Sequence, residues 1–387
     1  MNVLNEKPIN EVMDYVDAMV QLWIAGRDVA IPYLVGVPGI AKTANVLSMC
    51  EANDWNLLHT HYSLRPIEEV SGLPQFKDIS INGEEYKGTV WTLPDIMTTL
   101  YEIASNGKHT VWFLDDFHLA TSAHLSLAYE MFSQDRQLRG YSIPKNVGFV
   151  LAGNNSSKAG AKVMFSAIVN RVAKFPVTLD FNAWKSNFAL SHGVNTKVVS
   201  FLANESNKGK YFIGEESTDH PWPSPRSWTR LGEILSIVEN NRDPDQAEVL
   251  YLGSAHIGDE AASEFSSHYF VYSKIDIGSV FDRRIPVEIP GDMMHRYIYM
   301  MASNREFMDR YLKTKPNERR DLTMFYSAVL AKIAMVQSEI AIAGLKEIID
   351  YESSLKVSRL FTNVIDVLRQ VLPPDLFTKI VSDIRLL

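Results

Sequence analysis

Residues 36–43 constrain the fold of this sequence more than any other feature, because they form a run of small residues that ends in lysine and threonine. A strand-like run, Tyr33–Val35, precedes them, and a helical pattern begins at Lys42. In that setting the backbone N–H groups can wrap a chain of phosphates, and the helix N-terminus adds a favourable dipole. The residues of this phosphate loop are Gly36, Val37, Pro38, Gly39, Ile40, Ala41, Lys42 and Thr43. We expect Lys42 to reach the β- and γ-phosphates of a nucleotide and the Thr43 hydroxyl to bind Mg²⁺.

Ala41 stands where such loops have a glycine directly before the lysine. Alanine is small, and it costs little at this position if its backbone is helical. We therefore expect the substitution to leave the loop intact.

An apolar strand pattern, Val111–Leu114, is followed directly by two carboxylates, Asp115 and Asp116. Ligand sites of parallel sheets lie at the carboxyl ends of the strands, so these acids are expected beside the phosphate loop. Asp115 fits a role in binding Mg²⁺. Asp116 fits the orientation or deprotonation of an attacking water.

Strand-like runs alternate with helical patterns in the first half of the chain, which predicts an α/β fold with a parallel sheet covered on both faces. The expected strands are Tyr33–Val35, Leu57–Tyr62, Thr110–Leu114, Val147–Ala152 and Ala173–Leu179. The expected helices are 8–26, Lys42–Asn53, Asp95–Asn106 and Ser122–Gln134. Pro32 lacks an N–H for the strand ladder, so the first strand is expected to start after it.

Two hairpin ribbons are predicted as additions to this sheet. Asn82-Gly83, within residues 71–92, is a strong signal for a two-residue hairpin turn. A second ribbon is predicted to pair Leu138–Tyr141 with Val147–Val150.

Strand signals stop near residue 181, and helical patterns follow. We expect three domains: a nucleotide-binding α/β core at 1–181, a helical lid at 182–273 and a C-terminal helical segment at 274–387. Within them the composition predicts a surface loop at 204–224, a linker at 274–290 and an uninterrupted helical pattern at Leu322–Tyr351.

Composition narrows the class of protein. The net charge of −8 argues against a dedicated nucleic-acid binder, and the single cysteine, Cys50, excludes an internal disulfide. The first fifteen residues lack the basic and apolar pattern of a signal peptide, and no apolar run approaches the roughly 20 residues that cross a bilayer. We expect a cytoplasmic protein with no membrane span.

Histidines 59, 61, 109 and 118 share no helical face with a carboxylate. Two imidazoles on one face of a helix are a common way to hold a metal ion. No histidine metal site is therefore expected.

These motifs resemble those of the AAA+ ATPases, most closely the MoxR and dynein-related branch, in which a hairpin is inserted in the second helix. The resemblance covers residues 10–273 and includes Arg65–Gly72, similar to the run that leads into that hairpin. It implies a P-loop AAA+ parallel sheet core with an α-helical lid and a further α-helical C-terminal segment.

The resemblance also implies further site residues. Asn154 matches the polar sensor that helps to position the water, with Asn155 as the alternative one residue later. Arg171 matches the arginine that a neighbouring subunit supplies to the γ-phosphate, and Arg226 matches a second sensor arginine. The family usually has glutamate where Asp116 stands, so slow hydrolysis is an open alternative.

The function that the resemblance implies is ATP hydrolysis with Mg²⁺ by a homo-oligomeric ring, most often a hexamer. Such a MoxR-like chaperone remodels a protein or an assembly, and its partners include protein clients and von Willebrand A-type domains. Two alternatives stay open: a DNA-associated motor, and a slowly hydrolysing nucleotide-dependent scaffold or switch.

Overall fold

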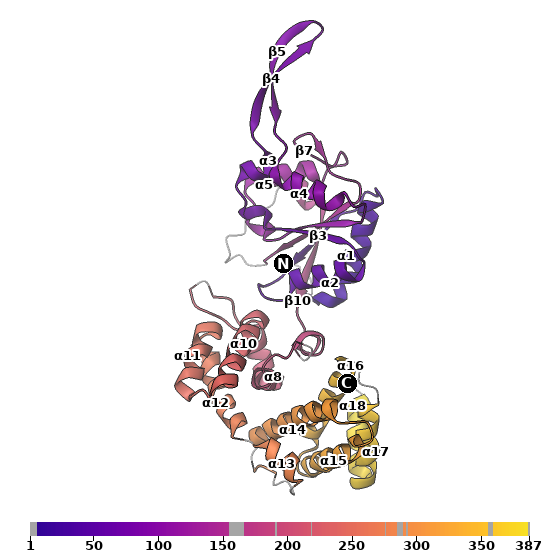
Figure 1. Cartoon of the computed structure of the whole chain (residues 1–387), viewed down its shortest axis with the longest axis vertical. Helices are drawn as coiled ribbons and strands as arrows, with labels where there is room; N and C mark the ends of the chain where they lie inside the picture. The colour runs from indigo at the N-terminus through magenta and orange to yellow at the C-terminus, as the bar shows by residue number, and fades with distance from the viewer. Residues whose placement is uncertain are drawn as a thin grey trace. The chain divides into compact units, whose positions relative to one another are not determined.

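The computed structural model describes residues 6–154, 166–189, 192–217, 219–274, 276–284, 289–291, 293–354 and 359–385. The chain divides into two compact units, Met1–Asp180 and Phe181–Leu387 (Figure 1). The first unit is α/β and the second is helical, which confirms the predicted fold class. The separation of a lid at 182–273 from a segment at 274–387 stays a prediction.

A parallel sheet forms the centre of the first unit, with the strand order β1-β10-β2-β9-β6-β3. Its strands are β1 (Lys7–Pro8), β2 (Ile31–Val35), β3 (Asn56–Thr60), β6 (Thr110–Leu114), β9 (Val147–Gly153) and β10 (Val172–Thr178). All residues of β2, β6 and β9 are buried. Strands buried on both faces have nearly continuous apolar sequences, which is why the pattern located them.

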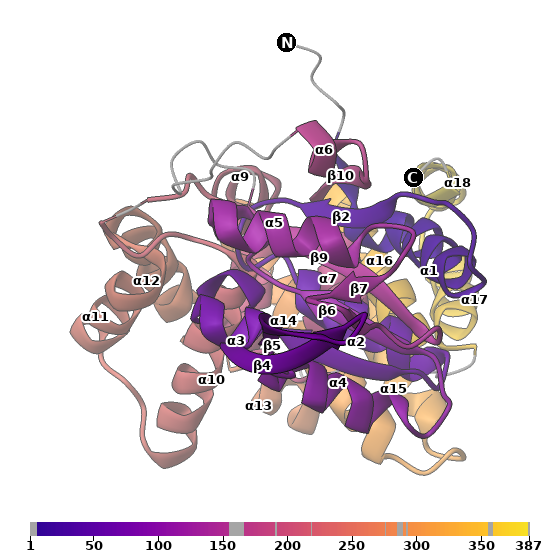
Figure 2. The same cartoon turned by 90° about the horizontal axis from the view of Figure 1, so that it is seen from above.

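Helices pack on both faces of this sheet, and Figure 2 shows the molecule from above. They are α1 (Ile9–Ile24), α2 (Lys42–Ala52), α3 (Ile67–Ser71), α4 (Asp95–Ala104), α5 (Ser122–Met131) and α6 (Ser166–Val169), with short 3-10 turns at Tyr62–Leu64 and Phe117–Leu119. Helix α1 buries Ile9, Val12, Val16 and Val20, which recur every three or four residues. It packs against β2, β9 and α2, whereas α4 packs against β3 and β6.

Aromatic side chains join the central strands. The ring of Phe149 on β9 lies 5.6 Å from the ring of Trp112 on β6 and 6.0 Å from that of Trp23 on α1. The buried indole Nε1 of Trp112 donates a hydrogen bond of 3.1 Å to the hydroxyl of Thr60. This bond ties the end of β3 to β6, directly before the polar residues that follow both strands.

The hairpin predicted around Asn82-Gly83 is confirmed. Strands β4 (Pro74–Ile81) and β5 (Glu84–Trp91) pair antiparallel and extend away from the rest of the first unit (Figure 1). Asn82 and Gly83 have φ angles of 54° and 86°, the left-handed conformation that a two-residue hairpin turn requires.

Two local predictions in the first unit are wrong. The second ribbon pairs β7 (Gln137–Leu138) with β8 (Tyr141–Ser142). Val147–Gly153 takes no part in it and is the core strand expected at Val147–Ala152. Strand β2 also includes Pro32, which pairs with Ala173 on β10. The N–H of Ile31 points to β10, so the nitrogen of Pro32 faces β9, whose ladder with β2 begins only at the next residue.

The second unit is built from helices in the part of it that the structure describes. They are α7 (Phe181–Trp184), α8 (Thr196–Ala203), α9 (Glu205–Asn207), α10 (Pro225–Asn241), α11 (Gln246–Ile257), α12 (Asp259–Ser273), α13 (Ile277–Arg283), α14 (Met293–Lys313), α15 (Arg319–Val336), α16 (Ser338–Ser354), α17 (Leu360–Val371) and α18 (Pro374–Arg385), with π-helical turns at Lys185–Ala189 and Lys208–Phe212. None of the helices described in either unit is long and apolar enough to cross a membrane.

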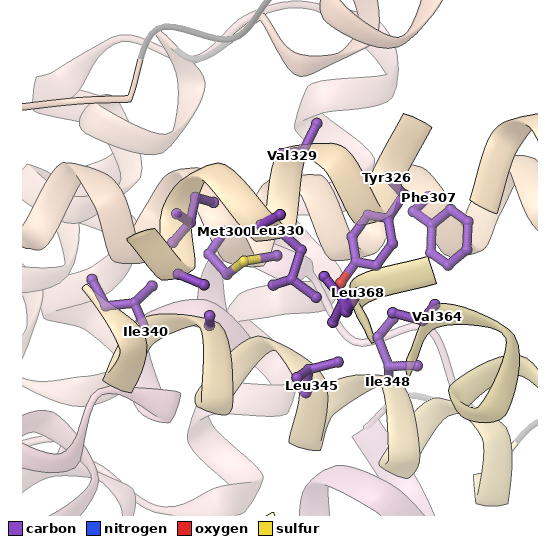
Figure 3. Close-up of a cluster of buried hydrophobic side chains, with 14 of the residues drawn as sticks. Met300, Phe307, Tyr326, Val329, Leu330, Ile340, Leu345, Ile348, Val364 and Leu368 are labelled. Carbon is purple, nitrogen blue, oxygen red and sulfur yellow. The ribbon is translucent and has the colours of Figure 1, made fainter. Parts of the chain in front are cut away.

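Helices α14 to α17 enclose a buried apolar cluster (Figure 3). The rings of Phe307 and Tyr326 stack within it, with centroids 4.1 Å apart. The hydroxyl of Tyr326 donates to Asn304, and the Asn304 amide donates in turn to the buried carboxyl of Glu347. Tyr326, Asn304 and Glu347 thus form a hydrogen-bonded chain inside the apolar cluster, as burial of polar groups requires.

The second unit departs from prediction at three places. The loop expected at 204–224 contains buried Tyr211 and Phe212 in a π-helical turn. The linker expected at 274–290 contains α13, which buries Ile277 and Phe281. The long helical pattern is two helices, because Gln337 is extended, with φ −155° and ψ 98°. Tertiary packing determines the secondary structure of these segments, and their local composition does not indicate that packing.

Candidate functional site

The phosphate loop lies between β2 and α2, as the sequence predicts. Gly36 is buried against β10, and a Cβ atom there would collide with the backbone carbonyl oxygen of Val177. Gly39 has a φ of 82°, which favours glycine. Close approach of the Val177 backbone thus explains Gly36, and the left-handed backbone conformation explains Gly39.

The backbone of Ala41 is not helical. The expectation that alanine costs little in place of glycine depended on a helical backbone. Its φ of 63° and ψ of 28° are left-handed, and it directly precedes α2 without a capping side chain. A left-handed residue with a Cβ atom is disfavoured by roughly 1–2 kcal/mol. The alanine is therefore a strained residue in the loop.

Lys42 is buried and reaches back into the loop. Its ammonium donates hydrogen bonds to the carbonyl oxygens of Gly36 at 2.7 Å and Val37 at 3.0 Å. It also donates to the side-chain oxygen of Asn154, directly after β9, at 3.3 Å. The structure thus brings a cation from α2 and an amide from β9 to the same edge of the sheet.

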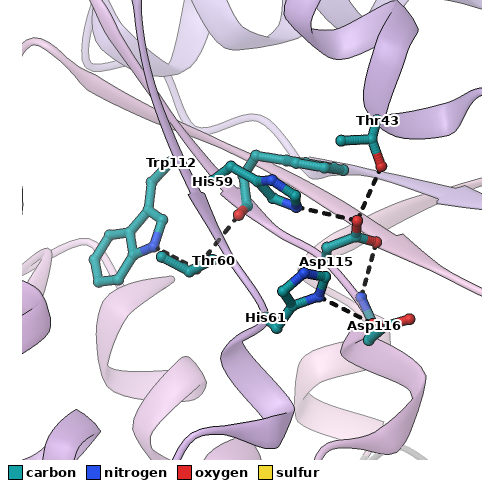
Figure 4. Close-up of polar contacts among 8 residues, drawn as sticks. Thr43, His59, Thr60, His61, Trp112, Asp115 and Asp116 are labelled. Atoms are coloured by element: carbon teal, nitrogen blue, oxygen red, sulfur yellow. Dashed lines mark hydrogen bonds and ion pairs between the residues drawn. The ribbon is translucent and has the colours of Figure 1, made fainter.

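Thr43 and Asp115 meet at this edge as well (Figure 4). The Thr43 hydroxyl donates to Oδ2 of Asp115 at 3.0 Å. Burial raises the pKa of Asp115, but hydrogen bonds from His59, the backbone N–H of Asp116 and Thr43 outweigh it and lower the pKa to about 2. Asp115 is therefore a carboxylate at neutral pH, and hydroxyl and carboxylate oxygens are ligands that suit Mg²⁺.

Two histidines that sequence reasoning set aside also lie here. Nε2 of His59 is 3.2 Å from Oδ2 of Asp115, and Nδ1 of His61 is 3.1 Å from Oδ2 of Asp116. Figure 4 shows both rings beside the two carboxylates. The signal was present in the sequence as His-x-His, because residues two apart share one face of an extended chain.

Asp116 has a left-handed backbone, with φ 54° and ψ 29°, and begins the turn Phe117–Leu119. Aspartate tolerates this conformation better than most residues, because its short side chain can hydrogen-bond locally. An aspartate therefore suits the backbone at this position. About a third of its side chain is exposed (32%), so its carboxylate is accessible to water.

Arg171 lies at the opposite edge of the sheet. Its carbonyl oxygen accepts from the N–H of Ile31 at the start of β2, whereas the phosphate loop follows the end of β2. The guanidinium stacks on the ring of Tyr129 at 4.2 Å and donates to the carbonyl of Ala167 at 3.0 Å. The structure does not bring Arg171 together with the loop of its own chain.

Arg226 belongs to the second unit, in the first turn of α10. Ser224 and Ser227 form a capping box at this helix start, and Pro225 occupies the first turn. Arg226 is exposed. The alternative sensor, Asn155, lies outside the described residues.

No protein-family model matches this sequence, and no curated protein matches it either. A solved structure of a RuvB mutant from Thermotoga maritima is 15% identical, covers 74% of this chain and 83% of its own, and has a TM-score of 0.36. Another RuvB structure from that organism, described as a Holliday junction branch migration motor, is 12% identical, with coverages of 72% and 78% and a TM-score of 0.34. NtrX from Brucella abortus is 14% identical, with coverages of 72% and 64% and a TM-score of 0.37.

We assign the fold from the chain itself rather than from these weak likenesses. The sheet is parallel, the phosphate loop follows β2 and precedes α2, and β6 delivers two acids to the same edge. The first unit therefore has a P-loop α/β fold, and a helical unit follows it in the chain.

Proposed function

We propose that this chain binds a nucleoside triphosphate with Mg²⁺ at the carboxyl edge of the sheet and hydrolyses it. The observation that carries the proposal is the convergence of three elements on the loop. Lys42 bonds to the loop carbonyls and to Asn154, while Thr43 bonds to Asp115. A cation, an amide and two oxygen ligands beside a glycine loop are what a polyphosphate with a divalent cation needs.

Each residue has a distinct task in this proposal. Lys42 binds the β- and γ-phosphates, and Thr43 and Asp115 hold Mg²⁺, which when bound neutralises charge on the phosphate oxygens. The exposed carboxylate of Asp116 accepts a proton from the attacking water. The amide of Asn154 orients that water once the ammonium of Lys42 turns to phosphate.

The position of Arg171 supports assembly into a ring. Five residues of β2 separate Arg171 from the loop, or roughly 16 Å along the sheet. An arginine side chain does not span that distance, so Arg171 does not serve the loop of its own chain. In this proposal it serves the phosphates of a neighbouring subunit. We propose a homo-oligomeric ring, a hexamer by resemblance, in which Arg226 of the helical unit is the second sensor.

The work of the ring is proposed to be remodelling of a protein or an assembly, as in MoxR-like chaperones. The β4–β5 hairpin supports contact with a protein client, because it is exposed and carries apolar side chains such as Phe76, which is 85% exposed. A client or a von Willebrand A-type partner fits such a ribbon better than DNA does, since acidic Asp78, Glu84 and Glu85 outnumber the basic Lys77 and Lys87 on it.

Steady-state ATP hydrolysis with Mg²⁺ at several protein concentrations tests this proposal. We expect turnover per subunit to rise with concentration, Lys42→Ala to abolish nucleotide binding, and Arg171→Ala to abolish turnover but keep binding. Arg27→Ala is the matched control, because Arg27 is an exposed arginine of the same unit outside the site. Parental turnover in Arg171→Ala would refute a neighbour-supplied arginine.

The same assay separates the alternatives. Nucleotide binding without turnover would favour a switch, in keeping with an Asp116 carboxylate that is engaged by His61 at 3.1 Å. Stimulation of turnover by DNA at low salt would favour a motor on DNA.

A further inference from the structure

His59, His61 and Asp115 form a cluster of metal-binding side chains at the carboxyl edge of the sheet. One ligand atom from each lies within 4.8 Å of the others. His59 belongs to β3, His61 directly follows that strand, and Asp115 directly follows the neighbouring strand β6. Two adjacent strands of the sheet therefore position all three ligands.

We propose that His59, His61 and Asp115 bind a first-row transition-metal dication of the Co²⁺ or Zn²⁺ class. Imidazole nitrogens suit these ions, whereas Mg²⁺ prefers oxygen ligands throughout. Two histidines and one carboxylate leave coordination positions open for water or for another oxygen ligand.

Each imidazole also pairs with an acid, His59 with Asp115 and His61 with Asp116. The two rings lie side by side, with centroids 5.0 Å apart, so two imidazoles are available beside the Asp115 carboxylate. Side chains of His59 and His61 are 33% and 56% exposed, so an ion can reach them from solvent. The carboxylate of Asp115 is largely buried and accepts a hydrogen bond from Thr43, which gives the ion one rigid anchor.

This site shares Asp115 with the proposed Mg²⁺ site, yet it does not rest on the proposed function. His59, His61 and Asp115 hold the ion without a nucleotide or a second subunit. Its test is therefore made in the absence of nucleotide, and its failure would leave ATP hydrolysis untouched.

The experiment is titration of the untagged, chelator-treated full chain with Co²⁺, read by the visible d–d absorption of the bound ion. Titration with Zn²⁺ followed by calorimetry gives a second readout. The variants are His59→Asn and His61→Asn, each expected to weaken binding at least tenfold. His109→Asn is the matched control, since His109 is an exposed histidine of the same unit that lies against Trp55.

The expected result is one Co²⁺ ion per chain, lost in both site variants and kept in the control. Circular dichroism of each variant checks that the fold is retained. Absence of Co²⁺ binding to the parental protein would overturn the proposal. Undiminished binding in both site variants would overturn it as well.

Discussion

Replacing Ala41 with glycine tests the geometry of the phosphate loop. The φ of 63° at Ala41 is left-handed, which costs a residue with a Cβ atom roughly 1–2 kcal/mol. Glycine escapes this penalty, but it gives the unfolded chain extra freedom worth roughly 0.4–1 kcal/mol. The balance predicts that Ala41→Gly stabilises the first unit by about 0.5–1 kcal/mol.

Ala44→Gly is the matched control for this substitution. Ala44 is exposed and lies inside α2, three residues further along the chain. Both substitutions remove the same methyl group, but at residue 44 the backbone is right-handed and helical. Ala44→Gly should therefore lower the free energy of unfolding of the first unit by roughly 0.8–1.0 kcal/mol. The two variants should differ in stability by about 1.5 kcal/mol, with Ala41→Gly the more stable.

Hydrogen exchange followed by mass spectrometry measures this difference. A single melting temperature is poorly defined for a chain of two units, whereas peptides from β2 and β6 report on the first unit alone. A difference of about 1.5 kcal/mol is roughly a tenfold difference in exchange rate. Equal destabilisation by both substitutions would show that residue 41 is not left-handed, and the reasoning from its backbone would be refuted.

Two further predictions concern buried groups. Burial raises the pKa of Glu347 above its ordinary 4.5, so the native carboxyl keeps a proton that the unfolded chain loses. The stability of the second unit should therefore fall as the pH rises above 4.5. In urea unfolding, Glu347→Gln should remove this dependence. Parallel curves of stability against pH for the parental protein and the variant would contradict the prediction. Gly36→Ala should cost the first unit about 1–3 kcal/mol by collision with Val177, measured by hydrogen exchange of β2 and β10. Gly209→Ala in the second unit, where a Cβ atom meets no neighbour within 4 Å, is its control and is measured by hydrogen exchange of that unit; an equal loss of stability there would argue against the collision.

The parallel sheet could be predicted from sequence because its inner strands are buried on both faces. Such strands need apolar side chains at nearly every position, so Val111–Leu114 stands out without knowledge of its neighbours. The structure gives β6 the bounds Thr110–Leu114, as predicted. The phosphate loop was predictable because its residues are contiguous in the chain. Gly39 suits the local backbone, with a φ of 82°, whereas Gly36 is required by the close approach of Val177 on β10.

Pairing between segments could not be predicted in the same way. The run at 147–150 is as suitable for a ribbon as for a core strand, and only its place between β2 and β6 decides the matter. Likewise, a helical pattern continues through Gln337, where the structure has a break between α15 and α16. Local periodicity reports which face of a segment is apolar, but it does not report which partner covers that face.

The two histidines show how the choice of period limits the prediction of a site. On a helix, residues two apart point in different directions, so helical spacing does not bring His59 and His61 together. They lie on an extended segment, where residues two apart share a face, and the neighbouring strand β6 ends in two acids. The expected strand at Leu57–Tyr62 already contained both histidines, so a period of two was the one to apply. Polar residues at the carboxyl end of each expected strand are therefore best considered together, because a parallel sheet gathers them at one edge whatever their separation in the chain.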